Sequence, residues 1–201
     1  MRQCERDYWI ERGECGEAIV AEWLQARDWY VLPTSFCRKP TSPGGAATKA
    51  TGELLIVPDI QAHRGGLAKW VEVKTKSRDV PYRKTNEVRQ GIEHKYFREY
   101  CRVAEESGMP GDLAFLVLES SHAGLSTLRV APLDTLDRHY SPSFGSRSRF
   151  NGAPMVFWPI DIFDSFEVHQ TELRPLAPRV SHPWPQRAKV GKVRKQGFFQ
   201  W

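Results

Sequence analysis

Three residues in one short stretch of this chain have side chains suited to the hydrolysis of a phosphodiester bond with a metal ion. Asp59 follows a proline, and Glu72 and Lys74 lie two residues apart in the apolar run AKWVEVKTK. This run predicts a β-strand, in which alternate residues project from the same face, so Glu72 and Lys74 would share one face. Two carboxylates supply the hard oxygen ligands that Mg²⁺ prefers, and a nearby ammonium group suits the attacking water and the developing phosphorane charge.

The flanking segments predict the elements that bring these residues together. Residues 29–36 favour a strand, and the Pro-, Gly- and Thr-rich residues 38–52 favour a mobile loop. Residues 53–64 and 67–76 predict two further strands joined by a Gly-Gly turn. The resulting hairpin would place the aspartate close to the Glu-x-Lys triplet.

An acidic residue lies on the apolar stripe of the helix predicted for residues 16–28. Glu17 is one helical turn before Val20, which belongs to that stripe. Because burying an unpaired charge is costly, Glu17 faces either solvent at the rim of the core or a metal-binding cleft. Glu14, three residues earlier on a neighbouring face, is the alternative candidate for this helical carboxylate.

The chain after the hairpin continues with a helix and more strands. Residues 91–106 predict a helix with one apolar stripe, formed by Ile92, Tyr96, Tyr100 and Val103. The continuous apolar run at residues 112–120 is typical of a central strand covered on both faces. Two more strands are predicted at residues 124–131 and 153–160, with a short helix at residues 133–139 between them. The predicted fold class is α/β, with the order α-β-β-β-α-β and a mixed sheet.

Length and charge indicate one domain followed by a basic tail. With 201 residues, the chain favours a single domain over residues 1–170, its core at about residues 14–119, and a strand-containing extension beyond that core. Residues 171–201 hold seven Lys or Arg and one acidic residue, Glu172, in a chain of net charge +5. The tail also contains Trp and Phe, so it would either bind phosphates and stack on bases, or act as a solubilising terminus or subunit-packing arm.

Other enzyme classes find little support in the sequence. The four cysteines have no CxxC spacing and the six histidines no HxH or HxxxH pairing, so a zinc or iron–sulfur site is not indicated. GxSxG and Walker-type glycine motifs are also missing. The charged first residues do not resemble a signal peptide, and no apolar run approaches membrane-spanning length. We therefore expect a soluble cytoplasmic protein with no membrane partner and no small-molecule cofactor.

The helix, the hairpin and the Glu-x-Lys strand together resemble the PD-(D/E)xK, or restriction-endonuclease-like, nuclease superfamily. Within it, the pattern is most similar to archaeal Holliday-junction resolvases and to phage or actinobacterial proteins of the same layout. The similarity covers roughly residues 14–119 and rests on Glu17 with its helix, on Pro58-Asp59 and on Glu72-Val73-Lys74. It implies an αβββαβ core with a mixed central sheet flanked by helices.

The resemblance also implies hydrolysis of DNA phosphodiester bonds with Mg²⁺ or Mn²⁺. Asp59 and Glu72 would bind the ion together with a backbone carbonyl, that of Val73. Lys74 would position or deprotonate the attacking water and stabilise negative charge. Glu17 would complete the site, either as a ligand of a second ion or through a metal-bound water.

The expected partner is DNA, cut by a homodimer because symmetric cleavage of two strands needs two sites. The candidate DNA-binding residues are Lys76, Arg78, Arg83, Lys84, Gln90, Lys95, Lys189, Lys192, Arg194 and Lys195. The first hypothesis is a resolvase-like endonuclease acting on branched or duplex DNA. The alternative is a catalytically silent nucleic-acid-binding or assembly protein with the same fold, and a third hypothesis is a nuclease directed at RNA.

Overall fold

The computed structural model describes seven segments of the chain, and all structural statements below concern them. These segments are residues 3–34, 46–48, 54–82, 87–118, 125–140, 142–147 and 153–169. The predicted tail at residues 171–201 lies outside the described residues. So does most of the predicted loop at residues 38–52.

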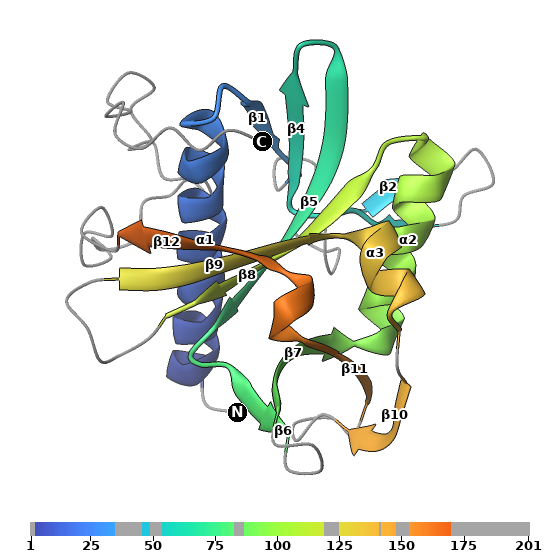
Figure 1. Cartoon of the computed structure of the whole chain (residues 1–201). Helices are drawn as coiled ribbons and strands as arrows, with labels where there is room; N and C mark the ends of the chain where they lie inside the picture. Colours follow the sequence, from blue (N-terminus) through green and yellow to red (C-terminus); the bar gives the residue numbers. More distant parts are fainter. Residues whose placement is uncertain are drawn as a thin grey trace.

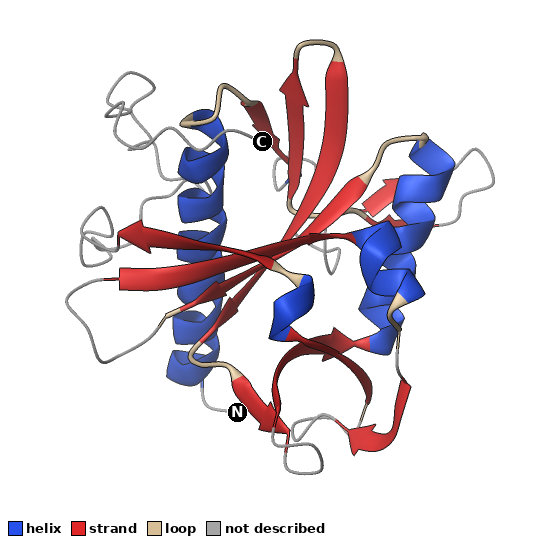
Figure 2. Ribbon diagram, in the orientation of Figure 1, coloured by secondary structure: helices blue, strands red, loops and turns tan. Residues whose placement is uncertain are grey.

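The described residues form helices and strands, and the strands β1 to β7 follow one another between α1 and α2 (Figure 2). The helices are α1 (Gln3–Gln25), α2 (His94–Ser107), α3 (Leu133–Arg138) and the short 3-10 helix η2 (Ile160–Ile162). The strands are β1 (Tyr30–Pro33), β2 (Ala46–Thr48), β3 (Leu54–Ile56), β4 (Ile60–Arg64), β5 (Leu67–Lys76), β6 (Val80–Tyr82), β7 (Glu87–Glu93), β8 (Gly111–Val117), β9 (Leu125–Pro132), β10 (Pro142–Arg147), β11 (Pro154–Pro159) and β12 (Asp164–His169). None of the described helices is long and apolar enough to cross a membrane.

A six-stranded mixed sheet forms the centre of the molecule, in the order β1-β4-β5-β8-β9-β12. β5 and β8 run parallel, whereas the other neighbours are antiparallel. Helix α1 lies against one face of this sheet, and α2 and α3 lie against the other (Figure 1). The mixed α/β architecture is therefore confirmed, and α1, β1, β4, β5, α2 and β8 follow the predicted αβββαβ order.

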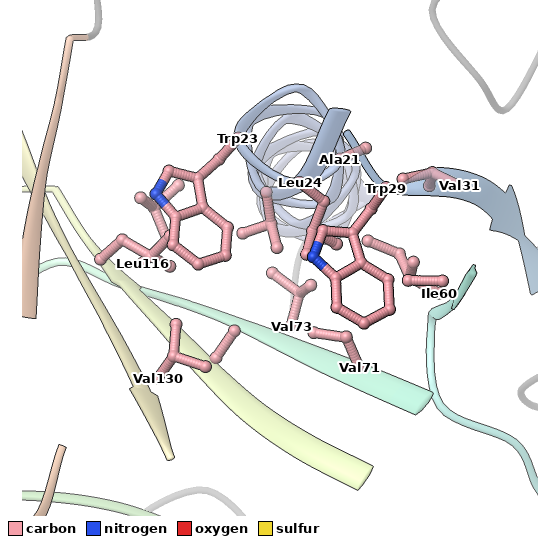
Figure 3. Packing of buried hydrophobic residues seen from close by; sticks show 14 of the residues in the cluster. Ala21, Trp23, Leu24, Trp29, Val31, Ile60, Val71, Val73, Leu116 and Val130 are labelled. Carbon is pink, nitrogen blue, oxygen red and sulfur yellow. The ribbon is translucent and has the colours of Figure 1, made fainter. Parts of the chain in front are cut away.

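The face covered by α1 is held by a large apolar cluster (Figure 3). Trp23 and Leu24 of α1 pack onto Val71 and Val73 of β5, and the cluster continues along β8 and β9. The helix approaches β5 closely at Gly16, where an added Cβ would lie 1.9 Å from Thr75 Oγ1 and 3.2 Å from Thr75 Cβ. A larger residue at this position would require the Thr75 side chain or the helix to shift.

A second cluster occupies the opposite face of the sheet, beneath α2 and α3. Phe97 of α2 packs edge-on against Trp158 of β11, and Phe115 of β8 packs in the same way against Phe163. A smaller sheet with the order β10-β11-β7-β6 contributes residues of β7 and β11 to this cluster. Residues of β8 alternate between the two clusters, which confirms the prediction of a central strand covered on both faces.

Several predicted boundaries were wrong because strand pairing between distant segments decides them. The predicted helix at residues 91–106 begins only at His94, since Glu87–Glu93 is the strand β7 and pairs with β11. The predicted strand at residues 53–64 is interrupted at Pro58 and Asp59, so that β3 pairs with β2 and β4 with β5. Helix α1 starts at Gln3, well before the predicted residue 16.

The close contact at Gly16 gives a direct test of this helix–strand packing. We expect Gly16→Ala to destabilise the protein by about 1–3 kcal/mol, because the added methyl group would overlap Thr75. Gly13→Ala on the same helix is the matched control, since its Cβ would meet no atom within 4 Å and would favour the helix by about 1 kcal/mol. Urea unfolding curves of both variants measure the difference. Equal effects of the two substitutions would contradict the contact.

Candidate active site

The site begins where β4 starts, and strand register places Asp59 there. Ile60 is paired with Val71, so Asp59, one residue before the strand, is level with Glu72. The Asp59 carboxylate accepts a hydrogen bond from the backbone N–H of Val73, with Oδ2 and N 3.0 Å apart. The two carboxylates are therefore neighbours, and both are buried, with Asp59 7% and Glu72 2% exposed.

A buried threonine fixes the backbone that carries Asp59. The hydroxyl of Thr34, just after β1, donates to the carbonyl of Pro58 at 2.6 Å and to that of Asp59 at 3.0 Å. The Thr34 N–H also donates to the Asp59 carbonyl at 3.0 Å. These bonds satisfy buried carbonyl groups at a point where the sheet ladder has ended. The aspartate is consequently held by two strands.

Lys74 and Tyr100 meet Glu72 on the face of the sheet that α2 covers. Lys74 Nζ forms an ion pair with Glu72 Oε1. The hydroxyl of Tyr100, which projects from α2, lies 2.5 Å from the same oxygen and 3.3 Å from Lys74 Nζ. Sequence reasoning placed Tyr100 on an apolar stripe and missed this contact. Its signal was the hydroxyl itself, because a buried tyrosine oxygen needs a hydrogen-bond partner.

Burial and neighbouring charges strongly affect the pKa values of Glu72 and Lys74. Burial, together with the charge of Asp59, raises the pKa of Glu72 to about 7, even though Lys74 and Tyr100 favour its ionised form. Burial also works to lower the pKa of Lys74, but the charges of Glu72, Tyr100 and Asp59 outweigh this and raise that pKa well above its ordinary value. Lys74 therefore keeps its proton at neutral pH.

This arrangement fits a divalent cation such as Mg²⁺. Among the described residues, the two buried carboxylates of Asp59 and Glu72 lie close together, and the ammonium group of Lys74 is paired with Glu72. Within the described residues, no three His, Cys, Asp or Glu side chains form a group that could hold a metal ion. Mg²⁺ often uses only one or two protein carboxylates and retains several waters, so Asp59 and Glu72 suffice as side-chain ligands.

The structure does not bring Glu17 into a group with Asp59 and Glu72. Glu17 follows Gly16 on α1, which packs against Thr75 on the face of β5 opposite to Glu72. It is only partly buried, whereas Glu14 is exposed. The role of Glu17 as a fourth site residue accordingly stays a prediction, as does the backbone contribution of Val73.

The predicted DNA-binding residues lie in different surroundings. Lys76 is partly buried on the same face as Lys74, while Arg78 and Lys95 are exposed. Gln90 is a correction, since it is fully buried in β7 rather than at a helix start, and its amide donates to Asp79 Oδ1 at 2.5 Å. The other six, Arg83, Lys84, Lys189, Lys192, Arg194 and Lys195, have side chains outside the described residues.

Lys76 differs from Lys74 although both project from the same face of β5. Its Nζ lies 5.8 Å from the centre of the Phe115 ring. Burial and the positive charge of Lys74 lower the pKa of Lys76 to about 8, and Glu93 opposes this shift. The two lysines therefore have oppositely shifted pKa values because only Lys74 contacts the carboxylates.

Comparison with known proteins yields a distant similarity to solved structures. No protein-family model and no curated protein matches this chain. Among solved structures, Hjc, a Holliday junction resolvase from the archaeal hyperthermophile Archaeoglobus fulgidus, is similar to 73% of this chain over 86% of its own length. The identity is 12% and the TM-score 0.43. Residue roles in this chain must therefore be judged from its own geometry.

The environment of Lys76 predicts a pH-dependent stability. Its pKa is lowered on folding from the ordinary 10.5 to about 8, so the unfolded chain binds more protons between these values. Stability contributed by this group therefore increases as pH rises through that window, and the cost of burying its charge is fully present below about pH 8. Lys76→Met should raise the urea midpoint more at about pH 7 than at about pH 10.

The exposed Lys95 on α2 provides the control for this measurement. Lys95→Met should change the urea midpoint little at either pH, because its ammonium group remains in solvent. An equal effect of Lys76→Met at both pH values would show that the Lys76 charge is not destabilised by burial.

Proposed function

We propose that this protein is a metal-dependent nuclease that hydrolyses DNA phosphodiester bonds. The observation that carries the proposal is the juxtaposition of Asp59, Glu72 and Lys74, with two buried carboxylates and one ammonium group on one face of the sheet. A surface ion pair would not need buried acids, because exposed pairs contribute little to stability. Perturbed titratable groups gathered in this way are typical of functional sites.

Each residue of the site would have a distinct task. Asp59 and Glu72 would hold the divalent cation, joined by the backbone carbonyl of Val73. When bound, Mg²⁺ or Mn²⁺ would supply Lewis-acid stabilisation of charge on a phosphate and a water of lowered pKa. Lys74 keeps its proton, so it suits orientation of the attacking water and neutralisation of developing charge better than proton abstraction.

Glu17 would act on the site through a metal-bound water. Direct ligation is not supported, since Glu17 is not grouped with the other two acids. However, β4 begins opposite Val71, so the part of β5 beyond Glu72 has no β4 neighbour, and α1 packs against Thr75 in that part. A carboxylate near this open edge of β5 could reach the site by way of solvent.

DNA is the proposed substrate because basic residues continue from the site. Lys76 follows Lys74 on the same face, Arg78 and Lys95 are exposed, and the net charge is +5. Lysine and arginine contacts to phosphates give sequence-independent affinity that weakens with salt. A resolvase-like choice of branched or duplex DNA and a homodimeric state are part of this proposal. The competing function is binding of nucleic acid without cleavage.

Cleavage assays with site variants test the proposal. The purified protein is expected to cut at least one of junction, flap, duplex or single-stranded DNA with Mg²⁺ or Mn²⁺ and not with EDTA, and matched RNA tests the RNA alternative. Lys74→Ala and Asp59→Asn should each reduce the rate by roughly 100-fold or more, because the first removes the ammonium group that would neutralise developing charge and the second removes a carboxylate that would hold the cation.

Asp161→Asn is the matched control for these variants, since Asp161 is exposed in η2 on a different part of the chain. It should leave the cleavage rate unchanged. Salt-sensitive DNA binding without cleavage by the wild type would establish the silent binding protein instead. Cleavage that survives both Lys74→Ala and Asp59→Asn would refute the site assignment.

A water-mediated role of Glu17 predicts that its substitution lowers the cleavage rate without abolishing cleavage. Glu17→Gln should lower cleavage by about 10- to 100-fold, the usual effect of removing a group that contacts metal-bound water. Increasing the Mg²⁺ concentration should restore part of the loss. Glu14→Gln tests the alternative helical carboxylate, and a loss confined to this variant would transfer the role to Glu14.

A further inference from the structure

Tyr100 contacts the site although the sequence pattern placed it only on the apolar stripe of a helix. It projects from α2 and is only 3% exposed. Its ring belongs to the apolar cluster below α2, but its hydroxyl reaches Glu72 and Lys74, at 2.5 Å and 3.3 Å. Packing alone would be served equally well by phenylalanine, so the hydroxyl calls for a separate explanation.

The direction of each hydrogen bond follows from the available protons. The ammonium group of Lys74 has protons only to donate, so the Tyr100 oxygen accepts from it. The single hydroxyl proton of Tyr100 is then directed to Glu72 Oε1. Tyr100 therefore accepts a hydrogen bond from Lys74 and donates one to Glu72.

Both donors converge on one oxygen of the Glu72 carboxylate. Lys74 and Tyr100 bind Oε1, and in the described part of the chain Oε2 has no hydrogen bond to a protein donor. A carboxylate held through one oxygen in this way has its orientation set by α2 and β5 together. The second oxygen remains available for a cation beside Asp59.

We propose that Tyr100 is a positioning residue that orients Glu72 so that Oε2 is the oxygen offered to the divalent cation. This inference rests on the proposed metal-dependent function and deepens it. Groups that hydrogen-bond to a metal ligand commonly strengthen metal binding by fixing the ligand's orientation. Tyr100 would thus affect metal affinity without touching metal or substrate.

Metal binding without DNA distinguishes this role from a purely structural one. Tyr100→Phe should weaken Mn²⁺ binding by roughly 10- to 100-fold, as measured by calorimetry on the full-length protein. Cleavage by Tyr100→Phe should need correspondingly more Mn²⁺ for half-maximal rate. Tyr96→Phe, the same change one turn earlier on α2, is the matched control and should leave the Mn²⁺ affinity unchanged.

Thermal unfolding with and without Mn²⁺ keeps the test valid if Tyr100→Phe is less stable. A ligand that binds only the folded state raises the melting temperature, and at a fixed ligand concentration the increase is larger when the ligand binds more tightly. A positioning role therefore predicts a smaller Mn²⁺-induced increase for Tyr100→Phe than for the wild type, whatever the metal-free melting temperature. A structural role alone would leave this increase unchanged.

Two results would overturn the inference, and they are distinguishable. Wild-type affinity for Mn²⁺ in Tyr100→Phe, with an unchanged metal requirement for cleavage, would reject the role of Tyr100 alone. Failure of the wild-type protein to bind Mn²⁺ at all would reject both this inference and the proposed metal-dependent function.

Discussion

The hydrogen bond from the Val73 N–H to the Asp59 carboxylate is the contact around which the site is built. The antiparallel ladder between β4 and β5 ends at the Ile60–Val71 pair, because the chain turns away at Pro58. Proline cannot continue such a ladder as a donor, and an N–H of β5 would be left unpaired in the protein interior. The Asp59 carboxylate instead accepts the hydrogen bond from this N–H group. The residue that ends the ladder thereby becomes a buried carboxylate beside Glu72.

Burial of this second carboxylate dictates the rest of the arrangement. Removing two like charges from water is costly unless donors or cations compensate them. Val73 compensates Asp59, while Lys74 and Tyr100 compensate Glu72. Burial, together with the charge of Asp59, still raises the pKa of Glu72 to about 7. Two ionised carboxylates beside one ammonium group would carry a net negative charge, and a cation would offset it, which is the physical link between the fold and the proposed chemistry.

Residues of the site were predictable from sequence where short-range geometry decides their positions. Alternation along β5 and the length of the hairpin are local properties, so Asp59, Glu72 and Lys74 came together as expected. The position of Tyr100 depends on how α2 packs on the sheet. The spacing of apolar residues along a helix does not predict that packing. Likewise, Glu17 was correctly placed on a partly buried helix, but the spacing does not state which face of β5 the helix covers.

The strand β7 was misread because Ile92 also fits the helical stripe of α2. In the structure Ile92 lies in β7, where Gln90 and Gly91 are buried as well. Pairing with β11, more than sixty residues later in the chain, makes this segment a strand. The amide nitrogen of the buried Gln90 finds its partner outside this strand pairing. Gln90 donates to Asp79, whose carboxylate in turn accepts from Arg129 at 2.7 Å.

Lys74 and Lys76 project from the same face of β5 but lie in different electrostatic environments. Lys74 lies among carboxylates and retains its proton, whereas burial and the charge of Lys74 lower the pKa of Lys76 to about 8 despite the opposing charge of Glu93. A phosphate placed beside Lys76 would favour its charged form and reverse this shift. Binding of a phosphate there would consequently be linked to proton uptake at slightly alkaline pH, because affinity and protonation are reciprocal. The chemistry of the site and its attraction for phosphate would then depend on different lysines.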